Sequence, residues 1–350
     1  MAVSETHISL SVSVGRWLTW LADPTPIHKP PRADINANEL SRLLDAAELH
    51  GVLATCLANL KRPEAAHCGS HSDTAGRRAS IIAAKSVRSI ERLSVQMLLW
   101  HHGKAVQKSL TEQKLPFMPV KGQTFAERLY PNPTFRGYTD IDLLIPIAAR
   151  AAVGDVLQSH GFELHAMDYR KGADYFEDKW IVHADQQVLI EVHCDLVHNP
   201  RLRRYFWLRY EDVLEAGNGN GADPAALLLV AAAHGSASHQ FDRLQHVVDV
   251  LQSARRIAGP IDVERLKTVA SRCGLLFAVI AALDLAGRMF DDPSCRSLLG
   301  ELAPRRFERA ASRLLSPKLV IGAQSEHRFL ASWRRKIFRQ TLRGAARQSA

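Results

Sequence analysis

The 350-residue sequence predicts an α+β fold, with a small β-sheet core between a helical N-terminal region and a helical C-terminal region. Two observations lead to this prediction. Apolar residues recur at helical spacing before residue 115 and after residue 200, whereas short runs rich in Val, Ile, Leu, Phe and Tyr lie only between them. We therefore predict four parts, which are residues 1–115, 116–200, 201–303 and a basic helical tail, 304–350.

The first 115 residues are predicted to be entirely helical. Apolar residues recur near helical spacing over residues 39–60, which predicts one amphipathic helix there. Residues 61–77 contain Pro, Gly, Ser and His, a composition typical of a loop. Residues 79–113 are rich in Ala, Leu, Arg and Lys and contain no Pro, so they predict one long helix or two helices end to end.

The middle of the chain is predicted to alternate strands with helices. The expected helices cover residues 122–130 and 147–161, and the second ends at Gly161, where a left-handed cap fits. After residue 200 every periodic segment has helical spacing. The five expected strands lie within residues 117–121, 140–147, 161–169, 179–185 and 187–196.

Composition limits the class of protein. Hydrophobic side chains make up 46% of the residues and charged ones 23%, which excludes disordered and collagen-like chains. No apolar run approaches the roughly 18 residues of a membrane span, and the N-terminus has no basic stretch followed by an apolar one. We therefore expect a cytoplasmic protein. The five cysteines are widely spaced without a C-x-x-C pair, so neither a disulfide framework nor a cysteine zinc site is predicted.

The net charge of +9 is concentrated at the C-terminal end, where residues 301–350 hold 12 Lys or Arg and 3 Asp or Glu. A basic tail of this kind can bind nucleic acid, an anionic membrane surface or an acidic partner, and it can equally be a solvated helical surface. Nucleic acid is possible but is not favoured, because the tail lacks regularly interleaved aromatic residues on which bases could stack.

Two carboxylates in the segment TDIDLLIPI are the first candidate for chemistry. Asp140 and Asp142 alternate with aliphatic residues, so in a strand they lie on the same face. Like charges side by side are costly unless a cation or a donor group pairs with them. Because magnesium is typically held by one or two carboxylates together with substrate phosphates, the pattern predicts a magnesium site.

A third carboxylate and a glycine turn complete the pattern. Glu191 interrupts an otherwise apolar strand, and if that strand neighbours the first, Glu191 joins the aspartates in a cluster able to hold two metal ions. Upstream, Lys121, Gly122 and Gln123 lie between an expected strand and an expected helix. A glycine there lets backbone N–H groups approach a phosphate, and Lys121 adds positive charge.

This order of elements, with KGQTFAERLYPNPTFRGYTDIDLLI and the later IEVHCDL, resembles the nucleotidyltransferase superfamily that has the DNA polymerase beta fold. More closely, it is similar to the family of uncharacterised nucleotidyltransferases related to aminoglycoside nucleotidyltransferases. The resemblance covers about residues 115–260 and implies a small mixed sheet as the catalytic core, followed by a helical domain that completes the cleft. The chain departs from the superfamily pattern at Gly122 and Gln123, where a glycine–serine pair is usual.

The resemblance also implies roles for individual residues. The carboxylates would bind magnesium in a two-metal site, where manganese can substitute. They would also bind the nucleoside triphosphate. Glu191 would help deprotonate or orient the acceptor. The residues implied to be catalytic and metal-binding are Asp140, Asp142 and Glu191. Those implied to contact the nucleotide are Lys121, Gly122, Gln123 and Arg136. Candidates for the acceptor side of the cleft are His193, His234, His239 and Asp249.

The predicted function is magnesium-dependent transfer of a nucleoside monophosphate, with ATP among the candidate donors, to a hydroxyl or phosphate of a small-molecule, sugar or peptide acceptor. Members of the family resemble tailoring enzymes of biosynthetic pathways. Two alternatives stay open: a catalytically inactive, nucleotide-binding regulatory module, and an RNA-directed terminal transferase. Motifs typical of dinucleotide oxidoreductases, P-loop proteins and α/β-hydrolases are absent, and so is H-E-x-x-H, so a histidine zinc site is not favoured.

Overall fold

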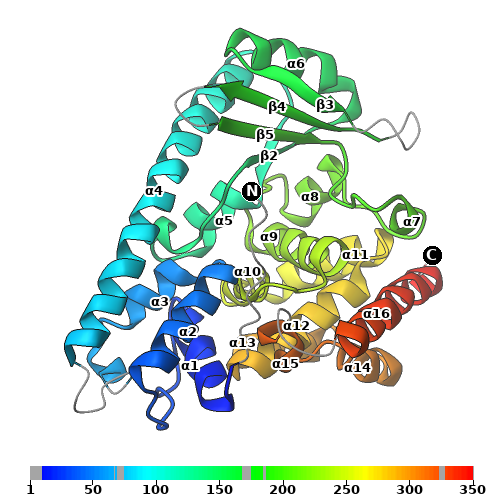
Figure 1. Cartoon of the computed structure of the whole chain (residues 1–350). Coiled ribbons are helices and arrows are strands. Elements are labelled where there is room, and N and C mark those ends of the chain that lie inside the picture. The colour runs from blue at the N-terminus through cyan, green and yellow to red at the C-terminus, as the bar shows by residue number, and fades with distance from the viewer. Residues whose placement is uncertain are drawn as a thin grey trace.

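The computed structural model describes residues 10–66, 68, 75–167, 175–183, 187–322 and 328–349. Within them the chain is α+β, as predicted, with helices before and after a five-stranded sheet (Figure 1). The predicted division into four parts stays a prediction. The packing described below joins helices from both ends of the chain in one hydrophobic core.

The helices before the sheet include one of 38 residues, α4, which spans roughly 57 Å at 1.5 Å per residue. It runs along one side of the molecule, packing against α2 and α3 at one end and against the sheet and α6 at the other (Figure 1). The described elements of this region are α1 (Val12–Ala22), α2 (Ala37–Leu49), α3 (Leu53–Asn59), the 3₁₀ turn η1 (Pro63–Ala65) and α4 (Ala75–Glu112).

Two details of this region differ from the prediction. The single helix expected over residues 39–60 is wrong, because the chain breaks at Gly51, whose φ of 74° is left-handed, and α3 starts afresh at Leu53. Helix α1 was not predicted. The loop expected over residues 61–77 contains η1 and the first residues of α4, and residues 67 and 69–74 lie outside the described residues.

The sheet is mixed, with the strand order β1-β2-β5-β4-β3. Strands β2 and β5 are parallel, and the other neighbouring pairs are antiparallel. Each predicted strand segment overlaps one of the observed strands, which are β1 (Met118–Val120), β2 (Ile141–Leu144), β3 (Glu163–Met167), β4 (Glu177–His183) and β5 (Gln187–His193). The helical elements between them are α5 (Gly122–Leu129), η2 (Pro133–Phe135), η3 (Ile147–Ala149) and α6 (Arg150–Ser159), and Gly161 has the left-handed φ predicted for it.

The two faces of the sheet have different chemistry because side chains alternate along each strand. Aliphatic side chains of β2 and β5 pack in a core with α4 and α6. The opposite face of the same two strands carries Asp142, Glu191 and His193, which occupy paired or adjacent positions. The polar face of the sheet therefore looks away from α4 and α6.

A helical domain follows the sheet, and its helix α9 continues directly into a π-helix, η4. Its elements are α7 (Pro200–Arg203), α8 (Tyr210–Ala216), α9 (Pro224–Ala233), η4 (His234–His239), α10 (Leu244–Ala254), α11 (Pro260–Arg272), α12 (Leu276–Phe290), α13 (Pro293–Glu301), α14 (Arg306–Ser312), α15 (Pro317–Ile321) and α16 (Arg328–Ser349). Helices α1 to α3 share one hydrophobic core with this domain.

The basic C-terminal helix α16 is part of that core. Phe338 is fully buried, and its ring lies 5.9 Å from the ring of Phe277 in α12, measured between centroids. Leu342 is buried on the same side of the helix. The tail is therefore attached along its apolar face.

The five cysteines are unpaired thiols in buried positions. Burial raises the pKa of the Cys68 thiol to about 12 and raises the pKa of Cys56, Cys273 and Cys295 even more strongly. Among the described residues, no helix combines the length and the hydrophobicity needed to cross a bilayer.

Candidate active site

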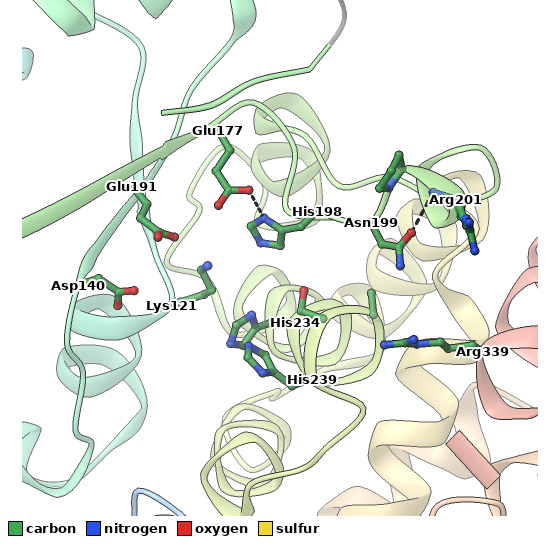
Figure 2. Close-up of a pocket in the computed structure, with 13 residues that line it drawn as sticks. Lys121, Asp140, Glu177, Glu191, His198, Asn199, Arg201, His234, His239 and Arg339 are labelled. Atoms are coloured by element: carbon green, nitrogen blue, oxygen red, sulfur yellow. Dashed lines mark hydrogen bonds and ion pairs between the residues drawn. The ribbon is translucent and has the colours of Figure 1, made fainter. Parts of the chain in front are cut away.

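A cavity of about 740 Å³ lies between the polar face of the sheet and the helical domain (Figure 2). This volume is within the roughly 300–1,000 Å³ of typical small-molecule sites. The sheet side contributes Lys121, Asp140, Glu177 and Glu191. The opposite side contributes His198, Asn199, Arg201, His234, His239 and Arg339.

Strand pairing brings the predicted carboxylates together. The parallel register of β2 and β5 places Asp142 directly opposite Glu191. Asp140, which immediately precedes β2, lines the same cavity as Glu191. The sequence argument for a three-carboxylate cluster depended on these two strands being neighbours, and they are.

Two lysines neutralise these carboxylates. The Nζ atom of Lys121 lies 2.6 Å from Oδ1 of Asp142, and both side chains are buried. The Nζ atom of Lys179, opposite Glu191 in the register of β4 and β5, lies 2.6 Å from Oε1 of Glu191. The cost of placing like charges side by side is thus offset by an amine for each of the two paired acids.

Lys121 holds its position with a strained backbone. It caps the start of α5 with φ of 55° and ψ of −137°, a combination that residues with a Cβ rarely adopt. Such conformations cost of order 1–3 kcal/mol and persist where surrounding contacts determine them. Here the contact is the buried ion pair with Asp142.

The environment moves the two aspartate pKa values in opposite directions. Burial, together with the neighbouring charge of Asp142, raises the pKa of Asp140 to about 6. Burial also opposes ionisation of Asp142, but the Lys121 ammonium and the hydrogen bond from His193 outweigh it and hold the pKa of Asp142 well below its usual range. Carboxylates separated in this way are typical of sites that carry chemistry.

His193 supports Asp142 from below the cavity. Its Nε2 donates to Oδ1 of Asp142 at 2.9 Å, and its ring is completely buried. Burial lowers the pKa of His193, so the ring is neutral and its lone pair is on Nδ1. Within the part of the chain that the structure describes, that Nδ1 has no hydrogen-bond partner. His193, a residue predicted for the acceptor side, contacts Asp142 and is not among the residues that line the cavity.

The wall facing the carboxylates is assembled from distant segments. Nδ1 of His198 lies 2.8 Å from Oε2 of Glu177, and Asn199 accepts a hydrogen bond from the backbone N–H of Arg201 at the start of α7 (Figure 2). His234 and His239 come from η4, and Arg339 comes from α16. The guanidinium groups of Arg201 and Arg339 give this wall its positive charge, and the imidazoles add hydrogen-bonding nitrogen atoms.

Two predicted phosphate ligands, Gly122 and Gln123, begin α5, and neither is among the residues that line the cavity. The side chain of Gln123 is buried, donates to Glu127 at 2.9 Å and accepts from Gln107 of α4 at 3.4 Å, so its amide faces α4. Gly122 begins α5, and a Cβ at that position would lie 3.4 Å from the backbone oxygen of Asp140. The glycine therefore allows α5 and the start of β2 to approach closely.

Arg136 and Asp249, predicted for the phosphates and for the acceptor, are brought to each other. Nε and Nη2 of Arg136 contact the two carboxylate oxygens of Asp249 at 3.2 and 3.0 Å, and both side chains are buried. Tyr130 donates to the same carboxylate at 2.8 Å. The pair joins the segment before β2 to α10 and is not among the residues lining the cavity.

Sequence reasoning missed several residues of the cavity, and it missed Lys179, which contacts Glu191. Glu177 and Lys179 alternate in β4 and share the polar face with Glu191, which is a period-two signal that the sequence does contain. His198, Asn199 and Arg201 follow β5 directly, whereas Arg339 is one of many basic residues in the tail. No local pattern distinguishes Arg339 from its neighbours.

Comparison with known protein families agrees with this geometry. A family described as uncharacterised nucleotidyltransferase matches residues 36–291, well over half of the chain. The chain belongs to this family. Membership confirms the resemblance seen in the short motifs, extends it back to α2 and supports nucleotidyl transfer as the general activity. No curated protein and no solved structure matches the chain.

The donor atoms of this nucleotidyltransferase fit a divalent cation. One ligand atom each from Asp142, Glu191 and His193 lies within 4.8 Å of the other two. Carboxylate oxygens are the ligands that magnesium prefers, and the unpartnered Nδ1 of His193 shows that the polar groups here are not all satisfied. An ion held there would take the place of the amine contacts that Lys121 and Lys179 make with Asp142 and Glu191.

Proposed function

We propose that the chain is a magnesium-dependent nucleotidyltransferase that moves a nucleoside monophosphate from a nucleoside triphosphate to a hydroxyl or phosphate of a small-molecule, sugar or peptide acceptor, as a tailoring step in biosynthesis. One observation carries the proposal: the carboxylate cluster on the polar face of the sheet lies across a cavity of about 740 Å³ from two arginines, Arg201 and Arg339. A metal-bound triphosphate needs both kinds of surface.

Different residues of the chain bind different parts of the metal-bound triphosphate. Lys121 contributes its ammonium to the cavity. Burial opposes this charge, but the Asp142 carboxylate beside it prevails and raises the pKa of Lys121. Arg339 and Arg201 of the facing wall supply further donors for phosphate oxygens. When bound, a divalent cation at the carboxylates supplies positive charge that offsets the charge of the triphosphate.

The reaction joins an acceptor oxygen to the α-phosphorus and breaks the bond between that phosphorus and the oxygen bridging to the β-phosphate, which releases pyrophosphate. In this proposal Glu191, which lines the cavity, accepts the proton of the acceptor hydroxyl. The remaining catalysis is positional and electrostatic, because the lysines and arginines hold the phosphates in one geometry.

Thermal unfolding with ATP, GTP, CTP, UTP and dTTP, each with and without magnesium, tests this proposal. We expect one or more triphosphates to stabilise the wild type only with magnesium, by about 2.7 kcal/mol at a hundredfold excess over Kd. Asp142→Asn removes the charge of a carboxylate at nearly constant shape and should abolish the shift. Manganese should restore part of it in the wild type.

The matched control is Asp155→Asn, which changes an exposed aspartate on α6, outside the cavity. This variant should show the full ligand-dependent shift. A wild type that no triphosphate stabilises in the presence of magnesium contradicts the proposal, and so does an Asp142→Asn variant that responds as strongly as the control.

A second candidate is a nucleotide-binding regulatory module without turnover. The observation that favours it is the pairing of Asp142 with Lys121 and of Glu191 with Lys179, because the amines contact carboxylate oxygens that a metal would use. Release of pyrophosphate distinguishes the two functions. Binding of a triphosphate without any pyrophosphate release, across acceptors of all three classes, supports the regulatory module.

A further inference from the structure

Three histidines meet beside the cavity, on two elements of the helical domain. His234 and His239 begin and end the π-helix η4, and His246 lies in α10. Their ring centroids are 4.5, 4.6 and 5.2 Å apart, and one nitrogen from each ring lies within 4.8 Å of the other two. No step of the nucleotidyl transfer described above requires this cluster.

The π-helix creates the cluster. In an α-helix, side chains five residues apart point about 140° away from each other around the axis. The wider turn of a π-helix brings His234 and His239 to the same side, and π-turns are frequent at functional sites. The chain then reverses through Gln240 and Phe241, both with φ of 52°, and α10 returns His246 to the first two rings.

Glycine at position 235 makes this reversal possible. A Cβ there would overlap the ring of Phe241, which is itself buried. The π-helix and α10 are therefore packed directly on each other, and the three imidazoles are held between them. The cluster is a fixed feature of the helical domain.

The polar atoms of the cluster are unsatisfied. Nδ1 of His234 and Nδ1 of His246 are buried and have no hydrogen-bond partner in the described residues, and the same holds for Oδ1 of Asp242. That oxygen lies 3.5 Å from Nδ1 of His246 and 3.8 Å from Nδ1 of His239. Buried polar groups are nearly always paired, so several orphans around one point indicate a missing ligand.

The imidazoles are in the protonation state that a metal ion requires. Burial lowers the pKa of His234 and of His246 well below the usual value, and neighbouring cationic groups lower it further. Both rings are therefore neutral near pH 7, with a lone pair available on one nitrogen. Neutral imidazole suits zinc and other divalent transition metals, whereas magnesium prefers oxygen ligands.

We propose that His234, His239 and His246 bind one divalent transition-metal ion of the zinc class, with the Asp242 carboxylate beside the imidazoles as an outer partner. His234 and His239 also line the cavity, on the side opposite Asp140 and Glu191 (Figure 2). A set of three histidines with one open position is typical of zinc that meets substrate. The site goes beyond the proposed function, since it needs neither the carboxylates nor a nucleotide.

Metal content of the full, untagged chain tests the proposal. The protein is incubated with zinc sulfate, desalted and analysed by mass spectrometry of the metal, and a parallel titration with cobalt(II) follows visible absorption. We expect about one zinc per wild-type chain. His239→Ala should lose it, and because the His239 side chain is 39% exposed, this change opens no core cavity.

Asp242→Asn provides a milder variant of the same shape, whose affinity for zinc should fall about 10- to 100-fold, as expected when an outer carboxylate partner is lost. Two control variants distinguish the histidine site from binding of zinc elsewhere on the protein. His165→Ala, on the exposed surface of β3, and Asp142→Asn, in the carboxylate cluster, should both retain the zinc of the wild type.

Three results would overturn the proposal: a wild type that retains neither zinc nor cobalt, a His239→Ala variant that retains as much zinc as the wild type, and an Asp142→Asn variant that loses zinc as His239→Ala does. The third would place the metal at the carboxylates. Since the measurement involves no nucleotide, a chain that binds zinc but no triphosphate would contradict the proposed function alone.

Discussion

Arg136 and Asp249 illustrate how a charged pair can serve the fold beside an active site. The guanidinium and the carboxylate form two hydrogen bonds in a buried position, and Tyr130 donates to the same carboxylate. Removing one member of such a pair leaves an uncompensated buried charge, which is far more costly than removing both. The pair therefore couples the segment before β2 to α10.

We predict that Arg136→Met lowers the free energy of unfolding by about 3–5 kcal/mol, because Asp249 loses its partner in the interior. The double variant Arg136→Met with Asp249→Leu should cost clearly less than the sum of the two single changes. Urea unfolding of the four proteins measures this. If the loss in free energy of unfolding of the double variant equals the sum of the two single losses, the two side chains do not act as a pair.

At the residue scale, the sequence predicted the acids better than their partners. Asp140, Asp142 and Glu191 stand out because charges rarely interrupt apolar strands. Lys179 reaches Glu191 only through strand pairing, and His198 reaches Glu177 only through the path of the chain after β5. No local pattern encodes either contact. The roles of these residues stay predictions until variants are measured.

Helix α4 contributes to both hydrophobic cores. At one end it is attached to α2 through Lys85, whose Nζ lies 2.7 Å from Oε2 of Glu48 and 2.6 Å from Oδ1 of Asp45. Arg92 contacts the other oxygen of Glu48 at 3.0 Å. Burial opposes ionisation of Glu48, but the hydrogen bond and charge of Lys85 prevail and lower its pKa.

This lowered pKa gives a prediction about pH. A carboxylate with a lowered folded-state pKa stabilises the fold above its unfolded value, here 4.5, and that contribution is lost as the pH falls through the folded-state pKa. Glu48→Gln should cost about 1–3 kcal/mol at pH 7. The difference from the wild type should shrink as the pH falls below 4.5, as followed by urea unfolding at each pH.

The control for this prediction is Asp45→Asn, since the Asp45 side chain is 43% exposed and screened by solvent. Its cost at pH 7 should stay below about 1 kcal/mol. If the difference in free energy of unfolding between the wild type and Glu48→Gln does not shrink at low pH, the variant is destabilised by lost packing and not by a lost ionic contact.

Periodicity predicted the type of most elements, and backbone exceptions account for the errors. The five strands and α4 follow from alternation and from an uninterrupted run of helix formers. The break between α2 and α3 depends on the left-handed Gly51, and the π-turn of η4 looks like ordinary helix in the sequence. Helix α1 was missed although its buried Val14, Leu18 and Leu21 have helical spacing.

On the scale of the whole molecule, the C-terminal helix α16 is packed against the helical domain and is not a separate tail. Its apolar side is buried against the helical domain, and Arg339 reaches the cavity. Arg334 and Lys336 are exposed, so an RNA-directed transferase would have to use such residues. Binding of that kind would weaken steeply as salt increases, which separates it from transfer to a small acceptor.

We predict that Phe338→Ala lowers the free energy of unfolding by about 3–5 kcal/mol, because the ring is fully buried and its removal leaves a cavity. Calorimetry should show one transition at a lower Tm, as expected if α16 and the helical domain unfold together. Trp333→Ala, which truncates an exposed aromatic residue of the same helix, should change the Tm little.

Because every native cysteine is buried, the protein is suited to labelling with a single fluorescent or spin label at an introduced cysteine. Thiol reagents attack the thiolate, and the raised pKa values keep the native thiols protonated and shielded at neutral pH. One cysteine introduced on the exposed face of α16 would therefore react alone, with all five native residues left in place. Emission or mobility of that label would report directly whether the C-terminal helix moves when a triphosphate enters.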